Sequence, residues 1–247
     1  MTIKQAAKGI LRRLRLYHPT PPIYIHPPTQ LENCFDALVQ LGFRPKCMVD
    51  VGANHGNWTR NALRYFPDLE VVMVEPQDWL RADMEDLLQS NPRLHWVTAG
   101  ASNQEGTLSL TIRERDDSSN FLLSAEDAAA QGLRQVDVPV TTVKALVEKF
   151  GLPVPDVIKI DAEGLDLKVL EGCGSFLGAT DLLFVEASLL LNAKDNAFVE
   201  VVNFMRQCGY ALFDVTDLNR SPNCGALCLL ELAFLREGSY LRSQTRW

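Results

Sequence analysis

The amino-acid sequence predicts an α/β protein with a Rossmann-like fold, built on a mostly parallel sheet of seven strands. Three observations support this prediction. Short apolar runs alternate with helical patterns, the order that builds a parallel sheet with crossover helices. A strand-like run, 47–51, ends at a glycine-bearing loop, 52–56, and a helical pattern begins at Asn57. Glu75 lies 23 residues after Gly52, at the end of the next strand-like run.

The loop at 52–56 has the sequence Gly-Ala-Asn-His-Gly, which suits a ligand site. Glycines let the backbone approach a ligand, and the start of the following helix offers unpaired N–H groups. Asn54 stands where such loops often have glycine, and asparagine tolerates a positive φ. An acid at Glu75 can accept hydrogen bonds from both hydroxyls of a ribose. We therefore predict a nucleoside site; the alternative is a strand–turn–helix corner without a ligand.

The first half of the chain is predicted from its periodicity. A helix is expected over 31–41, where Leu31, Phe35 and Leu38 share one face, and Gly42 ends it. Strands and helices then alternate, starting and ending with a strand. Their ranges are 47–51, 57–66, 70–74, 78–88 and 94–98.

Two runs with period-two alternation follow, 106–112 and 136–141, and we expect them to form an added hairpin at the sheet edge. Between them lies a polar, charged segment, 113–120, followed by three apolar residues. Polar segments of this length inside a domain are often functional. We predict that it faces the substrate through Ser118, Ser119 and Asn120; the alternative is an ordinary solvated connection.

The second half returns to the alternating pattern. Thr142 is expected to cap a helix over 143–150 that Gly151 ends. A strand over 157–160 leads into the turn 161–164, and a helix follows at once over 165–170. The remaining elements are a strand at 182–185 that ends at Glu186, a helix at 197–208, and strands at 210–215 and 226–234. No helix separates the last two strands, which predicts an antiparallel pair.

Three stretches of the sequence resemble the FkbM family of S-adenosylmethionine (SAM)-dependent methyltransferases. They are DVGANHG from Asp50, VEP around Glu75, and IKIDAEG over 158–164. The resemblance extends over about residues 49–234. It implies a class I methyltransferase fold with an antiparallel last strand, SAM as cofactor, and methyl transfer to a hydroxyl oxygen of a sugar or a natural product.

The expected SAM contacts come from the loop, the acid and two strand ends. The turn after the third strand, which contains Ala101, borders the adenine in this fold. The residues we assign to the cofactor are Asp50, Gly52, Ala53, Asn54, Gly56, Asn57, Glu75, Pro76, Ala101 and Asp161.

The expected catalytic groups lie at the carboxyl ends of strands, where open α/β sheets bind ligands. An aliphatic hydroxyl must lose its proton as it accepts the methyl group, so a base or a divalent cation is needed. We assign this role to Asp161, Glu163 and Glu186, with His55 of the loop as a further candidate. Alternatively, these acids form salt bridges to Lys159, Lys168 or Arg60.

A Mg²⁺ site is a second expectation for the same acids. Asp161 and Glu186 occupy the strand ends that supply metal ligands in catechol-type O-methyltransferases, and two carboxylates suit Mg²⁺. Those enzymes also use an asparagine beside the second acid, whereas Ala187 follows Glu186 here.

Composition limits the class of protein. The chain has 247 residues, of which 47% are hydrophobic, and a net charge of −7, which argues against a general nucleic-acid surface. The six cysteines form no CxxC pair, which favours reduced thiols in a cytoplasmic protein. No apolar run reaches transmembrane length.

Residues 1–30 are predicted to form a separate basic helix and proline-rich linker before a catalytic domain over 31–247. The first sixteen residues carry five positive charges and no acid, and their apolar residues have helical spacing. Such a helix can lie on an anionic membrane, or it can pack on its own domain or a partner subunit.

The sequence thus favours a SAM-dependent O-methyltransferase that acts on a small-molecule or glycan acceptor, through a sugar hydroxyl. The alternatives are the same reaction on a macrolide or peptide natural product, an NAD-binding oxidoreductase, and a catalytically silent SAM-binding module.

Overall fold

The central strand of the structure is β1, Cys47–Val51, which is buried along its whole length. The computed structural model describes residues 29–189 and 196–245. β1 is buried because parallel strands pair with it on both sides, β2 (Glu70–Glu75) on one and β7 (Val157–Ile160) on the other. The chain order of the strands reverses between β1 and β7, the position where open α/β sheets bind ligands.

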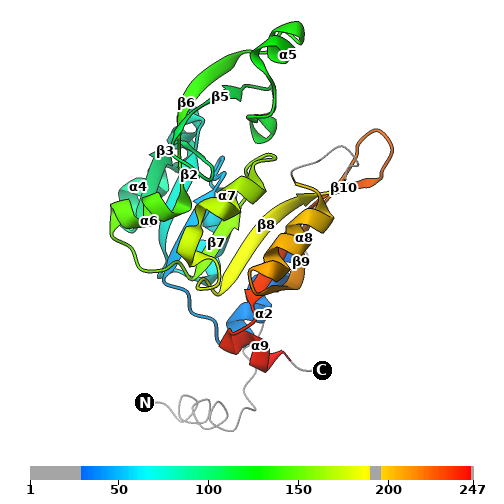
Figure 1. Ribbon diagram of the computed structural model, residues 1–247. Helices are drawn as coiled ribbons and strands as arrows, with labels where there is room; N and C mark the ends of the chain where they lie inside the picture. Colours follow the sequence, from blue (N-terminus) through cyan, green and yellow to red (C-terminus); the bar gives the residue numbers. More distant parts are fainter. Residues whose placement is uncertain (1–28, 190–195, 246–247) are drawn as a thin grey trace, which may run out of the picture.

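The main sheet has seven strands in the order β3-β2-β1-β7-β8-β10-β9 (Figure 1). β10 is antiparallel to both of its neighbours, while the other neighbouring pairs are parallel. The prediction of a mostly parallel sheet with an antiparallel last strand is therefore confirmed. The remaining bounds are β3 Leu94–Thr98, β8 Leu182–Ser188, β9 Tyr210–Arg220 and β10 Leu227–Arg236.

Helices cover both faces of this sheet because its central strands bury apolar side chains on both sides. One apolar cluster joins the sheet to α2 (Gln30–Gln40), α3 (Asn57–Tyr65) and α9 (Tyr240–Gln244). The other joins it to α6 (Val143–Phe150), α7 (Asp166–Gly172) and α8 (Phe198–Gln207). The expected cap of α6 is present, since Thr142 accepts a hydrogen bond from the N–H of Ala145.

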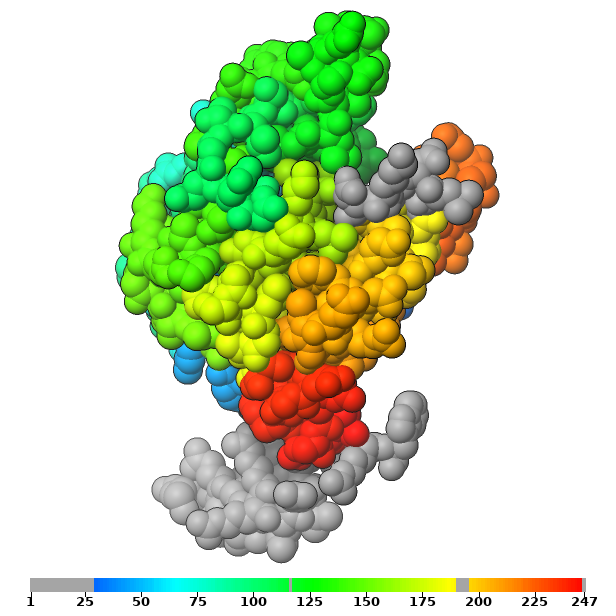
Figure 2. Space-filling view, viewed as in Figure 1, coloured from blue at the N-terminus to red at the C-terminus, as the bar shows by residue number. Residues whose placement is uncertain are grey.

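The two alternating runs pair as expected, but they do not extend the main sheet. β5 (Gly106–Thr111) and β6 (Gln135–Thr141) are antiparallel, and β6 also pairs with the short β4 (Gly100–Ala101) to make a second, three-stranded sheet. The segment between β5 and β6 contains a 3-10 turn, η2 (Asp116–Ser118), and α5 (Ala125–Ala130). In Figure 2 this green part forms a lobe at the top of the molecule.

Two predicted elements differ in detail, and one element was not predicted. The helix expected at 78–88 is a 3-10 helix, η1 (Asp78–Met84), followed by α4 (Glu85–Ser90). A further 3-10 turn, η3 (Gly174–Phe176), follows α7. β8 runs beyond residue 185 because its end pairs with β10, with Glu186 opposite Glu231.

In the described part of the chain, no helix has the length and apolar character needed to span a membrane. The predicted basic helix and linker lie almost wholly outside the described residues, which begin at Thr29.

Candidate functional site

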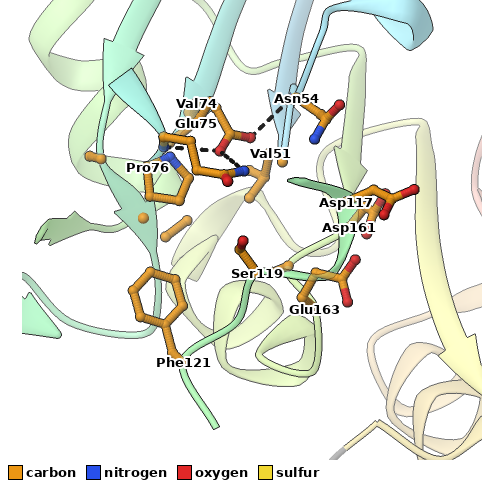
Figure 3. Close-up of a pocket in the computed structure, with 16 residues that line it drawn as sticks. Val51, Asn54, Val74, Glu75, Pro76, Asp117, Ser119, Phe121, Asp161 and Glu163 are labelled. Atoms are coloured by element: carbon orange, nitrogen blue, oxygen red, sulfur yellow. Dashed lines mark hydrogen bonds between the residues drawn. The ribbon is translucent and has the colours of Figure 1, made fainter. Parts of the chain in front are cut away.

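A pocket with an empty volume of about 550 Å³ opens beyond the carboxyl ends of β1, β2 and β7. The pocket has two chemically different ends (Figure 3). Pro76 and Phe121 lie at an apolar end, and the carboxylates of Asp117, Asp161 and Glu163 gather at the other.

The glycine loop after β1 reaches the pocket with Gly52 and Asn54. Both have a left-handed backbone, with φ of 73° and 47°, so asparagine takes the conformation expected of it. A Cβ atom on Gly52 would lie 1.9 Å from the carbonyl oxygen of Asp161. The loop therefore packs directly on the turn after β7, and only glycine allows this approach.

Glu75 at the end of β2 is 3% exposed and holds the loop in place. One carboxylate oxygen accepts the N–H of Asn54 at 2.9 Å. The other accepts the backbone N–H and the side-chain amide of Gln77 at 3.0 and 3.1 Å. Burial raises the pKa of Glu75, although these hydrogen bonds oppose the shift. A carboxylate has about four acceptor sites, so Glu75 keeps capacity for a ribose hydroxyl.

The turn after β7 carries two acids of the pocket, Asp161 and Glu163. Glu163 has a φ of 49° and Gly164 a φ of 98°, so the turn is left-handed at two successive residues. Asp166, which is fully buried, accepts the N–H groups of Ala162 and Gly164 at 3.0 and 3.1 Å. Burial raises the pKa of Asp166 to about 7.

The acidic end of the pocket changes the titration of Glu163. Burial raises the pKa of Glu163 to about 8, and the carboxylates of Asp161, Asp166 and Asp117 contribute to the shift. A group with a pKa near the working pH is well suited to general acid–base catalysis.

Lys159 of β7 connects the glycine loop after β1 to the turn after β7. Its ammonium is buried and donates to the carbonyl oxygens of Gly52 at 2.8 Å and Val51 at 3.3 Å. It also forms ion pairs with Asp161 at 3.4 Å and Asp50 at 3.5 Å. Burial acts to lower the pKa of Lys159, but the two carboxylates outweigh it and raise the pKa. The salt bridge considered as an alternative for Asp161 is thus present, and the same acid also lines the pocket.

Several predicted cofactor residues lie in the pocket wall. They are Gly52, Asn54, Glu75, Pro76, Ala101 and Asp161. The pocket wall does not include the other predicted cofactor residues, Asp50, Ala53, Gly56 and Asn57. Asp50 is buried beneath the loop, where its carboxylate accepts the hydroxyl of Thr59 at 2.5 Å. Gly56 packs against Met84, since a Cβ atom there would lie 1.7 Å from the Met84 sulfur.

Two predicted catalytic residues, His55 and Glu186, are not part of the pocket wall. The ring of His55 forms a 2.6 Å contact with the carboxylate of Asp83 in η1, and its side chain is 41% exposed. Glu186 lies within β8 instead of at its end, opposite Glu231 of β10. Burial raises the pKa of Glu186, and the carboxylates of Asp161, Asp166 and Glu163 raise it further.

The segment 113–123 reaches the pocket, but not through all of the predicted residues. Ser119 lines the pocket, with Asp117 and Phe121 beside it. Ser118 and Asn120 instead bond to their own segment, through the carbonyl oxygens of Arg115 and Ser118.

Sequence reasoning missed Asp117, Phe121 and Asp166. Asp117 and Phe121 lie in or next to the polar segment 113–120, which the sequence does mark as functional. The sequence does not indicate which side chains of this segment point into the pocket. Asp166 follows the turn by two residues in the first turn of α7, and this position is a signal for a cap.

The expected Mg²⁺ ligands do not form a metal site. Among residues 29–189 and 196–245, no group of three or more His, Cys, Asp or Glu side chains is placed to hold a metal ion. Asp161 forms an ion pair with Lys159, and Glu186 lies in the middle of a strand. The donor set therefore does not fit the expectation of a Mg²⁺ ion.

The strand order, the antiparallel β10 and the pocket at the carboxyl ends of β1, β2 and β7 define a Rossmann-like class I methyltransferase fold. The family described as the methyltransferase FkbM domain matches residues 50–212, about two-thirds of the chain. The chain belongs to the FkbM methyltransferase family.

Similar proteins include the methyltransferase sdnD of Sordaria araneosa, 26% identical over 169 residues, which cover 57% of this chain and 64% of that protein. Among solved structures, the methyltransferase FkbM from Methylobacillus flagellatus KT is 20% identical with a TM-score of 0.48, covering 76% of this chain and 43% of that one. The precorrin-6y C5,15-methyltransferase from Geobacter metallireducens GS-15 is 13% identical with a TM-score of 0.45, covering 89% and 93%. The chain thus spans less than two-thirds of the length of sdnD and of the solved FkbM protein.

Proposed function

We propose that this chain binds SAM in the pocket and transfers the methyl group to a hydroxyl oxygen of a sugar or glycosylated metabolite. The observation that carries the proposal is the two-ended pocket, with the loop and Glu75 between an apolar end and an acidic end. Membership of the FkbM methyltransferase family supports methyl transfer as the reaction.

The residues present fit SAM at three points. The apolar end suits a planar base, Glu75 has acceptor capacity for a ribose hydroxyl, and the loop brings Gly52 and Asn54 to the pocket. When bound, SAM supplies an activated methyl group on a positively charged sulfur. Because this positive charge is favourable beside carboxylates, we assign the reactive end of the cofactor to the acidic end, where Asp117 and Asp161 line the pocket.

Glu163 is the group we assign to accept the proton of the acceptor hydroxyl. It lines the pocket, and with a pKa of about 8 only about a tenth of it is carboxylate at pH 7, a fraction that grows as the pH rises through 8. Asp161 has its charge balanced by Lys159 and orients the same hydroxyl as a hydrogen-bond acceptor. Holding acceptor and methyl group in line can supply about 7–11 kcal/mol of the barrier reduction.

The test combines binding and turnover. Calorimetry with S-adenosylhomocysteine and with NAD separates a methyltransferase from an oxidoreductase: we expect binding of the first only. Transfer of labelled methyl groups to a panel of sugars, glycosides and aglycones then tests the acceptor. Methylation of aglycones but no sugar hydroxyl would overturn the sugar assignment, and NAD binding without S-adenosylhomocysteine binding would overturn the reaction.

A further inference from the structure

The apolar end of the pocket has an aromatic wall that comes from outside the main sheet. Phe121 follows β5 and belongs to the second sheet's connecting segment, yet it lines the pocket together with Pro76 and Gly100. Figure 3 shows the rings of Phe121 and Pro76 at the same end of the pocket, away from Asp161 and Glu163. Among the lining residues, Phe121 is the aromatic one.

The ring of Phe121 rests against the backbone at Gly100. A Cβ atom on Gly100 would lie 2.8 Å from Cζ and 3.2 Å from Cε2 of Phe121. Any side chain at residue 100 would therefore displace the ring. Phe121 is only partly buried and belongs to neither of the two apolar clusters on the faces of the main sheet. Its apolar surface faces the pocket instead of completing the core.

Hydrogen bonds on both sides of Phe121 fix its backbone. Asn120 and Thr111 exchange backbone hydrogen bonds of 2.8 and 3.2 Å. The carbonyl oxygen of Leu123 accepts the side-chain amide of Gln135 at 3.0 Å. A ring held in this way is preorganised, so a ligand that meets it does not have to order the segment.

The neighbouring residue anchors the segment at the other side of the pocket. Leu122 packs against the turn after β7, because a Cβ atom on Gly164 would lie 2.8 Å from Leu122 Cδ1. The segment thus spans from Gly100 at the apolar end to the turn that carries Glu163.

On the basis of the proposed SAM-binding function, we propose that Phe121 recognises the adenine ring of the cofactor by stacking on it. A planar base meets an aromatic face, small residues and a proline at this end of the pocket. Glu75, the candidate ribose partner, is adjacent to Pro76 in the chain. Stacking of a base on an aromatic side chain is favourable, and its geometry does not depend on the identity of the base.

The test is binding of S-adenosylhomocysteine by wild type, Phe121→Ala and Phe121→Leu, measured by calorimetry. We expect Phe121→Ala to bind roughly 5- to 150-fold more weakly, the range that follows from removing the aromatic partner of a stacked base. Phe121→Leu keeps apolar volume but has no aromatic face, so its affinity should lie between those of the wild type and Phe121→Ala. Adenosine alone should show the same loss, since it contains the base and lacks the amino-acid tail. Leu108→Ala on β5 is the matched control, because Leu108 is 36% exposed and does not line the pocket.

A second measurement does not depend on a destabilising truncation. In Phe121→Trp, emission of the added indole should be quenched when S-adenosylhomocysteine binds, and Leu108→Trp should show no added quenching. A loss in Phe121→Ala smaller than about threefold, or an unresponsive indole at residue 121, would overturn the role of Phe121. Failure of the wild type to bind S-adenosylhomocysteine would instead overturn the proposed function, and this inference with it.

Discussion

At the scale of single residues, the two acids of the turn after β7 have different surroundings. Asp161 forms an ion pair with Lys159 at 3.4 Å. Glu163 has a φ of 49°, a conformation that costs a non-glycine residue on the order of 1–3 kcal/mol and persists where the surrounding structure imposes it. This strain lies at a pocket, which supports a functional reason for it.

Neutral amides at these two positions should separate chemistry from binding. Glu163→Gln keeps size but removes the base, so we expect turnover to fall by about 10²–10⁴ with little change in S-adenosylhomocysteine affinity. Asp161→Asn should also lower turnover, because it removes the charge that pairs with Lys159 and leaves a neutral, weaker acceptor for the hydroxyl. In the wild type, kcat should rise with pH through about 8, since Glu163 is protonated below that value. Near-normal turnover of Glu163→Gln would remove it as the base.

Glu75 should be required for cofactor affinity. Glu75→Ala removes the acceptor of the Asn54 and Gln77 N–H groups as well as the candidate ribose partner. We expect S-adenosylhomocysteine binding to weaken by about 1–3 kcal/mol, measured by calorimetry. A folded Glu75→Ala protein with wild-type affinity would contradict the assignment.

At the scale of elements, the site depends on how the turn after β7 enters α7. Asp166, in the first turn of α7, uses both carboxylate oxygens to bind N–H groups of the turn. The loop after β1 then packs on the same turn through Gly52. The glycine loop after β1 and the turn after β7 therefore hold each other in place. Asp166 of α7 and the buried Lys159 of β7 support both.

Asp166→Asn should damage both stability and turnover. The amide has one accepting oxygen, so either the Ala162 or the Gly164 N–H loses its partner, at a cost of about 1–3 kcal/mol. Because Glu163 lies between these residues, turnover should fall more than the loss of stability explains. Denaturant unfolding and kinetics at a temperature where the variant is folded are the measurements. Lys168→Ala, at an exposed position of α7, is the control. If Asp166→Asn and Lys168→Ala changed stability and turnover equally, Asp166 would not be needed to hold the turn after β7.

At the scale of the whole molecule, the fold buries several acids. Burial raises the pKa of Glu163 to about 8, of Asp166 to about 7 and of Glu231 to about 7. Glu231 accepts hydrogen bonds from the indole of Trp58 at 2.9 Å and the hydroxyl of Thr216 at 2.6 Å. The fold therefore holds protons that the unfolded chain releases at lower pH.

These shifts predict that stability falls as pH rises. The folded pKa of each acid lies above its unfolded value near 4, so the folded state binds more protons between about pH 4 and pH 8. The stability that each acid contributes is then fully present below its unfolded pKa and is lost as the pH rises through its folded pKa. Thermal unfolding from pH 5 to 8.5 should show a falling Tm, with a flatter profile in Glu231→Gln. A Tm that rises over this range would contradict the shifts.

The last prediction at this scale is that the basic N-terminal segment, residues 1–16, binds anionic membranes. The chain carries −7 and residues 1–16 carry +5, so the rest carries −12 (−7 minus +5). A basic segment on an acidic protein should favour anionic surfaces. Co-sedimentation with anionic liposomes should decrease on deletion of residues 1–16 and at high salt, and neutral liposomes are the control. Equal sedimentation with and without these residues would assign them to packing or assembly.

The sequence by itself determined the order of the elements and most strand bounds of the main sheet. β1, β3 and β7 have the predicted bounds; β1 and β7 are buried along their whole length, and strands buried on both faces read as mainly apolar runs. The glycine loop, Asn54 and Glu75 were also predictable, because a left-handed turn and a strand-end acid depend on local sequence. The short η1 helix and the separate second sheet were not, since both depend on what packs against them.

Only the tertiary structure decided which side chains share the pocket. Pairing with β10 extends β8 and places Glu186 inside a strand, and no local pattern encodes that register. The contact of His55 with Asp83, the support from Asp166 and the position of Phe121 over Gly100 are likewise settled by neighbours in space. Local sequence sets backbone conformation. Which residues a polar or aromatic side chain contacts depends instead on how segments distant in the sequence pack together.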